Sequence, residues 1–301
     1  NRVLEKMAYH TQHLVQGLCL YTPWRKQGEQ GKAYMEESRI IKMINNNPSI
    51  ISTINNPTDE MKLLAIKKDG LTLEYIDNPT IEMQELALDN NIRTIRYIDN
   101  PTEEMMIKAV NEGWSILDYI KNPTDKVIEL AINQAGWAIK YAKNPSEELQ
   151  LLAVRKNYDS IKFIKSPYES VQKEAIKISY DALRYINSPS HNIEIEAIKN
   201  NEAAISFIHN LDKDKILNFL KENILVIKYV AREISKEDLE EVLKEVLAKE
   251  EVEEKYVRDF LNCSMIDRNS KNFEIDKIML IYKYGSKKAR KIAVDEKLKM
   301  I

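Results

Sequence analysis

The sequence predicts an all-α protein, a right-handed α-solenoid of about nine two-helix repeats with helical flanks at both ends. Three observations carry this prediction: a proline every 22 residues, an apolar pattern typical of a helix of about ten residues after each proline, and a second, shorter apolar pattern that completes each unit. The regularly spaced prolines are Pro57, Pro79, Pro101, Pro123, Pro145, Pro167 and Pro189.

Each proline belongs to a phrase that predicts the start of a helix. In five units the phrase is Asn-Pro followed by Thr or Ser, as in Asn56-Pro57-Thr58, and Ser166-Pro167-Tyr168 is a drifted copy. Proline disfavours helical geometry in the residue before it, and a following hydroxyl can cap a new helix. Acidic residues such as Asp59 and Glu60 come next, where they complement the helix dipole.

The longer helix of each unit shows one apolar face. Within a unit, apolar residues recur at i, i+4 and i+5, as in Met61, Ala65 and Ile66. The middle position is alanine in every proline-marked unit, which predicts a close approach of two backbones there. This column consists of Ala65, Ala87, Ala109, Ala131, Ala153, Ala175 and Ala197.

The shorter element carries an i, i+3 apolar pair, such as Leu73 and Ile76, with an aromatic residue between the two. A segment of five or six residues with this pattern predicts one or two turns of α or 3₁₀ helix. We expect the aromatic column to lie at the edge of the buried face, and the asparagines of the Asn-Pro phrase to bond neighbouring backbones. The aromatic column is Tyr75, Tyr97, Tyr119, Tyr141, Phe163, Tyr185, Phe207 and Tyr229.

The pattern consists of a short apolar helix, the phrase Asn-Pro-Thr and a longer helix with a central alanine. This pattern resembles the leucine-rich variant and HEAT-like repeats. It also resembles short Asn-Pro-Thr/Ser helical repeats of bacterial and phage proteins. The resemblance covers nearly two-thirds of the chain. It implies a superhelix of alternating α and 3₁₀ helices, and a phage or mobile-element protein that acts on a host factor or within a larger assembly.

The repeat pattern predicts three parts: residues 1–34 as an N-terminal cap, 35–232 as the repeat array, and 233–301 as a C-terminal cap or small domain. In the first part we expect a helix and then a polar loop over residues 21–31. In the last part, apolar periodicity predicts four helices, over about 235–247, 252–261, 274–283 and 286–298.

Composition bounds the function only loosely. The net charge is −2, which indicates neither a nucleic acid nor a membrane as partner. The chain holds two cysteines, Cys19 and Cys263, and this small number favours a reducing cytoplasm over a disulfide framework. No apolar run is long enough to predict a membrane span. His10, His13 and Cys19 lie close in sequence, but their spacing matches no known zinc motif, so we expect no metal site. Phosphate loops and catalytic sets are also missing, so we expect a non-enzymatic protein without a cofactor or small-molecule ligand. An enzyme in the C-terminal part is a third possibility.

The positions that vary between units are the candidates for binding. At the start of the short helix, large aromatic residues replace small ones, and aromatic and Arg side chains dominate interface energy. The alternative is that the tryptophans fill gaps between units. The predicted contacts to a protein partner are Trp114, Trp137, Tyr158, Tyr180 and Arg93 on the array, with Trp24 and Arg25 in the N-terminal flank.

The rival hypothesis is nucleic-acid binding, because helical repeats can cradle a duplex in a basic groove. Its support is a basic C-terminal segment together with the Tyr and Arg residues of the short helices. Against it, residues 57–210 carry 18 basic and 24 acidic residues, and phosphate contact needs clustered cations. The candidate residues in the basic segment are Lys283, Lys287, Lys288, Arg290 and Lys291.

Overall fold

The computed structural model describes residues 24–299, with side chains from residue 35 onward. Its described part is almost entirely helical, with a single pair of two-residue strands, which confirms the predicted all-α class. The chain forms two compact units, Asn1–Ala109 and Val110–Ile301. The predicted boundaries at residues 34 and 232 stay predictions.

The helices repeat with the predicted period, and both helices of each pair begin 22 residues after their counterparts in the pair before. The long helices have ten residues each: α3 (Asp59–Lys68), α4 (Ile81–Asn90), α5 (Glu103–Glu112), α6 (Asp125–Gln134), α7 (Glu147–Lys156), α8 (Glu169–Ile178), α9 (His191–Asn200) and α10 (Lys213–Glu222). The short 3₁₀ helices are η1 (Pro48–Thr53), η2 (Gly70–Tyr75), η3 (Ile92–Tyr97), η4 (Trp114–Tyr119), η5 (Gly136–Tyr141), η6 (Tyr158–Phe163), η7 (Tyr180–Tyr185), η8 (Glu202–Phe207) and η9 (Ile224–Val226).

The predicted caps are present at the starts of the long helices. The Thr58 hydroxyl accepts a hydrogen bond from the backbone N–H of Met61, at 3.3 Å, and the Thr80, Thr102, Thr124, Ser146 and Ser190 hydroxyls make the same bond in their own helices. Each bond satisfies one of the N–H groups that a helix start leaves without a partner. Tyr168 occupies the cap position of α8 and makes no such side-chain bond.

In the first unit, α2 (Trp24–Asn46) is a continuous helix of 23 residues. The predicted loop over residues 21–31 is therefore wrong from Trp24 onward. The physical reason is that only Gly28 and Gly31 oppose a helix there, while the neighbouring Lys, Gln and Glu residues favour one. The core of this region consists of Ile44, Ile51, Met61 and Ala65.

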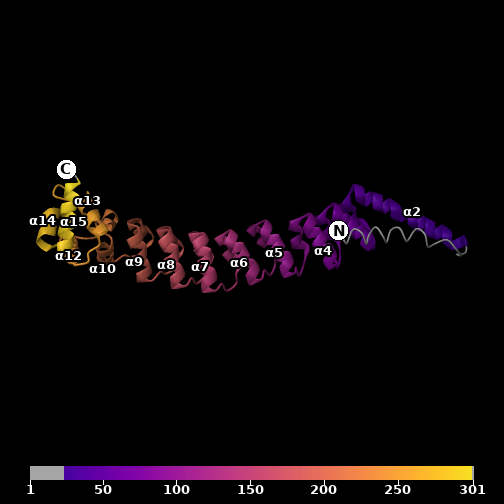
Figure 1. Ribbon diagram of the computed structural model, residues 1–301, viewed down its shortest axis with the longest axis horizontal. Coiled ribbons are helices and arrows are strands. Elements are labelled where there is room, and N and C mark those ends of the chain that lie inside the picture. The colour runs from indigo at the N-terminus through magenta and orange to yellow at the C-terminus, as the bar shows by residue number, and fades with distance from the viewer. Residues whose placement is uncertain (1–23, 300–301) are drawn as a thin grey trace. The chain divides into compact units, whose positions relative to one another are not determined.

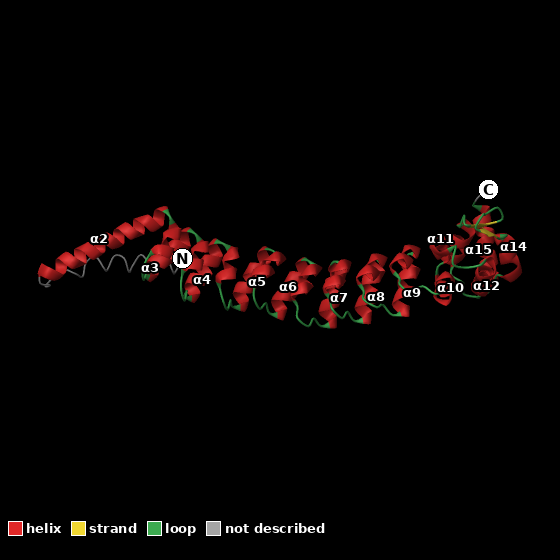
Figure 2. Cartoon of the chain, turned by 180° about the vertical axis from the view of Figure 1, so that it is seen from behind, coloured by secondary structure: helices red, strands yellow, loops and turns green. Residues whose placement is uncertain are grey.

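In the second unit, successive long helices pack on one another, and so do successive short helices. Figure 1 shows α6, α7, α8 and α9 side by side in chain order, and Figure 2 shows the loops that join them. The alanine column is fully buried, as predicted for a close approach. At Gly136 a Cβ atom would lie 2.2 Å from the carbonyl oxygen of Ala153, so the start of η5 touches the end of α7.

The amides that bridge neighbouring helices come from a different column than we expected. Asn56 and Asn78 instead adopt the left-handed backbone conformation of the turn, with φ values of 51° and 50°. The asparagines that bridge neighbouring helices directly follow the carboxyl ends of the long helices. Asn157 Oδ1 accepts from the N–H of Gly136 at 2.8 Å, and Asn223 Nδ2 donates to the carbonyl of Ile198 at 2.9 Å.

The four helices predicted after residue 233 are present. After α11 (Ile227–Val230) come α12 (Lys236–Leu247), α13 (Glu254–Asn262), α14 (Lys277–Tyr284) and α15 (Lys287–Leu298). The sequence did not predict β1 (Ile266–Asp267) and β2 (Phe273–Glu274), which pair in parallel. A Ser235–Asp238 capping box begins α12, where hydrogen bonds from Lys213 and Ser235 lower the pKa of Asp238 to about 2.

Among residues 24–299, none of the helices combines the length and the apolar character needed to cross a membrane.

Candidate interaction surface

The candidate partner-binding residues fall into three groups in the structure. Trp114, Tyr158 and Tyr180 are the first residues of η4, η6 and η7, and Trp137 is the second residue of η5, all in the second unit. Arg93 is exposed on η3, in the first unit. Trp24 and Arg25 begin α2, and their side chains lie outside the described residues.

The two tryptophans form a pair across neighbouring short helices. Their ring centroids lie 6.4 Å apart at an interplanar angle of 57°. Trp114 is half-buried, whereas Trp137 keeps 36% of its surface exposed. The pair therefore fills space between two repeats and also presents an aromatic surface to solvent.

Asp159 of η6 holds Trp137 in place. The Trp137 Nε1–H donates to Asp159 Oδ1 at 2.8 Å, and Lys162 Nζ donates to Asp159 Oδ2 at 2.7 Å. Partial burial raises the pKa of Asp159, but the hydrogen bonds from Lys162 and Trp137 outweigh this effect, so the pKa is lowered. The carboxylate thus stays charged and fixes the indole ring.

A second polar group surrounds Trp114. Tyr141 donates its hydroxyl hydrogen to Asp118, and Lys140 Nζ lies 3.8 Å from the same carboxylate. The Lys140 amine also lies over the rings of Trp114 and Tyr141, at 5.6 and 4.6 Å from their centroids. Burial and the bond to Asp118 both raise the pKa of Tyr141, which therefore remains a neutral donor.

The same arrangement of ring, cation and carboxylate continues on later short helices. Lys162 lies 5.7 Å over the ring of Tyr185, and Arg184 lies 4.8 Å over the ring of Phe207. Tyr180 stacks on Phe207, with centroids 6.3 Å apart, so it belongs to this later group and not to the tryptophan pair. We call the surface formed by Trp114, Trp137, Lys140, Asp159, Lys162, Tyr180, Arg184 and Phe207 the aromatic edge.

The cations of this edge were not among the residues predicted from the sequence. Lys140, Lys162 and Arg184 stand 22 residues apart and directly precede the aromatic column, so their spacing alone could have revealed them. Their contact with the rings of the next or preceding repeat depends on how the repeats pack.

The basic residues of the C-terminal segment lie on other elements, Lys283 on α14 and the remaining four on α15. Lys288 Nζ pairs with Glu251 at 3.1 Å, Lys283 lies over the ring of Tyr284, and Arg290 lies 5.9 Å over the ring of Tyr282. Lys287 and Lys291 are exposed.

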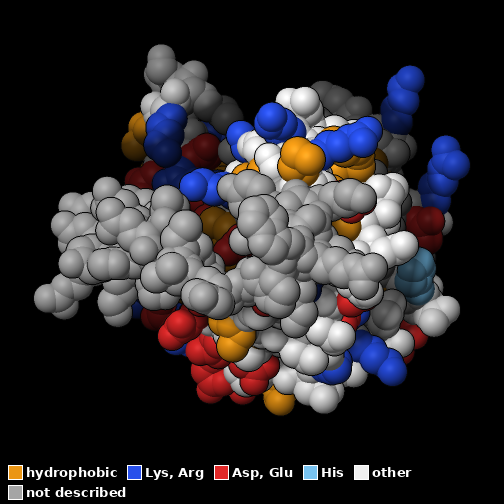
Figure 3. Space-filling view, turned by 90° about the vertical axis from the view of Figure 1, so that its right-hand side faces the viewer, with side chains coloured by type: hydrophobic (Ala, Val, Ile, Leu, Met, Phe, Trp, Pro, Cys, Tyr) orange, Lys and Arg blue, Asp and Glu red, His pale blue; other side chains and the backbone are white. Residues whose placement is uncertain are grey.

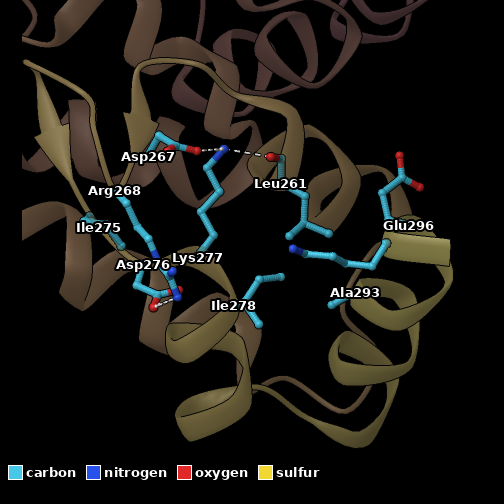
Figure 4. A pocket seen from close by; sticks show the side chains of 10 residues that line it. Leu261, Asp267, Arg268, Ile275, Asp276, Lys277, Ile278, Ala293 and Glu296 are labelled. Carbon is cyan, nitrogen blue, oxygen red and sulfur yellow. Dashed lines mark hydrogen bonds and ion pairs between the residues drawn. The ribbon is translucent and has the colours of Figure 1, made fainter. Parts of the chain in front are cut away.

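A pocket of about 390 Å³ lies between the strand pair and α14 and α15. Figure 4 shows the Lys277 amine directed at Asp267 and at the carbonyl of Leu261, with Arg268 paired to Asp276 beside it. Lys277 is buried and donates to the carbonyls of Leu261 and Cys263 at 2.7 and 2.9 Å, and its Nζ lies 3.6 Å from Asp267 Oδ2. Burial lowers its pKa. Because these three oxygens surround the amine, Lys277 holds the segment from Leu261 to Asp267 against the start of α14.

Within the described part of the chain, no group of three or more His, Cys, Asp or Glu side chains could hold a metal ion. His10, His13 and Cys19 lie outside the described residues. Comparisons with protein-family models, curated proteins and solved structures give no match to this chain.

Proposed function

We propose that this chain is a non-enzymatic repeat scaffold that binds a protein partner through the aromatic edge. The observation that carries the proposal is the Trp114–Trp137 pair, which is partly exposed and held rigid by Asp159. Large aromatic side chains that are already fixed lose little entropy on binding and are enriched among the residues that dominate interface energy.

We also propose the finer architecture, a right-handed α-solenoid of the leucine-rich variant or HEAT-like type. Its support is the regular alternation of ten-residue α helices with 3₁₀ helices at a 22-residue period. The associated proposal, that the protein acts on a host factor or within a larger assembly of a phage or mobile element, rests on the sequence resemblance alone.

The charges of the aromatic edge favour a protein over a nucleic acid. Lys140, Lys162 and Arg184 each lie within 4 Å of a carboxylate, at Asp118, Asp159 and Asp181. A phosphate backbone would have to displace these carboxylates. Figure 3 shows the molecule from one end, where side chains of both charges are exposed.

Affinity purification of the chain from cells that naturally express it tests the proposal. We expect Trp114→Ala combined with Trp137→Ala to reduce the recovered partner by at least about tenfold, since central aromatic residues contribute about 2 kcal/mol or more each. Tyr75→Ala, which removes an exposed ring from η2 in the other unit, is the matched control and should retain the partner. Undiminished recovery with the double variant, at unchanged helical content, contradicts the proposal.

A gel-shift titration with duplex and single-stranded DNA and RNA at about 50 mM salt tests the rival function. We expect no shift at micromolar protein. A shift that weakens steeply with added salt would favour nucleic-acid binding instead.

A further inference from the structure

An apolar groove of about 450 Å³ runs between α14 and α15, away from the aromatic edge in sequence and in the elements that form it. Three of its side chains are unusually exposed for apolar residues of their size: Tyr282 at 70%, Val294 at 58% and Leu298 at 65%. The other lining residues are Ile278, Ile281, Arg290, Ala293 and Lys297.

Both helices already bury another face. Leu280 of α14 and Ala289 and Ile292 of α15 are buried, and α15 packs against α13 as well as α14. A helix that packs on one side of a protein normally has a polar opposite side. The exposed apolar residues of α14 and α15 therefore form a second surface, beyond what the fold needs for its own core.

The rim of this groove is basic. Along α15, Lys287, Arg290, Lys291, Val294 and Lys297 each lie three or four residues from another member of the set, so they share one face of the helix. Arg290 and Lys297 line the groove, and no carboxylate lines it among the residues that the structure describes.

α15 has two acidic residues, Asp295 and Glu296. Asp295 is exposed and does not line the groove, and Glu296 is turned to another helix. Glu296 pairs with Arg258 and accepts from Asn262 Nδ2 at 3.1 Å, and both of these residues lie on α13. The groove thus combines an apolar floor with cations that a partner's carboxylates can reach.

We infer that this groove binds an acidic amphipathic helix of a partner protein. Apolar side chains at i, i+3 or i+4, and i+7 of that helix fill the space between Tyr282, Val294 and Leu298. Its flanking Asp and Glu residues pair with Arg290, Lys297, Lys287 and Lys291. The concave apolar floor suits the ridge of a helix better than a flat bilayer. A phosphate backbone would pair with the same cations but would leave the apolar floor uncovered, so an amphipathic helix fits the groove better.

The test is a selection from a displayed library of helical peptides of about 18 residues, about five turns, with randomised apolar and charged positions. The full chain is the target. We expect the selected peptides to be negatively charged and to repeat apolar residues with helical spacing. Val294→Glu, at an exposed position, should weaken their binding at least about tenfold, and Arg290→Glu with Lys297→Glu should reverse the charge preference.

Trp137→Ala is the matched control and should leave peptide binding unchanged, which separates this groove from the aromatic edge. Failure to enrich any peptide, enrichment of peptides without apolar periodicity, or equal binding to Val294→Glu overturns the inference. So does tighter binding to anionic phosphatidylserine vesicles or single-stranded DNA than to the selected peptides, in an assay that includes both as competitors.

Discussion

Gly136 shows how a single residue decides the contact between two repeats. Its missing side chain lets the start of η5 approach the carbonyl oxygen of Ala153, and its N–H donates to Asn157 at 2.8 Å. Gly70 makes the equivalent approach to Ala87 in the first unit. Other repeats carry Trp114 or Tyr158 in this column. The close contact that glycine permits is therefore a feature of some repeats and not of all.

Gly136→Ala should destabilise the protein by about 1–3 kcal/mol, because the added Cβ overlaps backbone that cannot swing away. Chemical denaturation followed by circular dichroism measures this change. Ser115→Ala, at an exposed position on η4, is the control and should stay within about 0.5 kcal/mol of wild type. An unchanged midpoint for Gly136→Ala would show that the repeat contact relaxes freely.

Among the candidate binding residues, the tryptophans could be predicted because they break the repeat pattern. Their mutual contact and the bond from Trp137 to Asp159 could not, because these residues lie 22 or more positions apart. Such contacts depend on the distance between neighbouring short helices, which local sequence does not set. For the same reason Tyr180, also predicted, pairs with Phe207 instead of the tryptophans.

At the scale of the element, the helix starts follow the sequence closely because caps are local interactions. The hydroxyl and the N–H that it satisfies are three residues apart, so the phrase alone predicts the bond. Tyr168 keeps the backbone geometry of the capping position, with φ −59° and ψ 152° against −66° and 158° at Thr58, but it lacks the short hydroxyl. The start of α8 is thus shaped for a cap that the side chain cannot make.

Tyr168→Thr should therefore stabilise the protein by about 1 kcal/mol through a new bond to the N–H of Val171. The lost ring is half exposed, so little burial is given up. Thr80→Ala is the reciprocal control and should lose a similar amount. Thermal unfolding of the three proteins measures both changes, and a lower midpoint for Tyr168→Thr would mean that the ring packs more strongly than its exposure suggests.

At the scale of the whole molecule, stability should be distributed locally. The helices of each unit contact mainly their neighbours in the chain, as expected for repeats whose stability is a sum of nearest-neighbour terms. Asn223 is one of these links, because its buried side chain donates to Ile198 O and accepts from Leu225 N.

Asn223→Ala should cost about 1–3 kcal/mol, since it leaves a buried carbonyl and an N–H without their partner. Native-state hydrogen exchange should accelerate in α9, α10 and η9 and stay unchanged in α3 and α4. Asn223→Asp keeps the acceptor for Leu225 but places a carboxylate oxygen against the carbonyl of Ile198, so at neutral pH it should cost at least as much as Asn223→Ala. Uniform acceleration along the chain would instead indicate that the molecule unfolds as one cooperative body.

The amino-acid sequence by itself determined the period, the ten-residue length of the long helices, their caps and the four C-terminal helices. These features arise from interactions within about ten residues, which a local pattern records. Only the tertiary structure decided which amides bridge the repeats, where Gly136 meets Ala153, how Lys277 clamps its loop, and that α14 and α15 leave an apolar groove between basic residues. Those features join residues far apart in the chain, so they follow from helix packing, which the spacing of prolines does not encode.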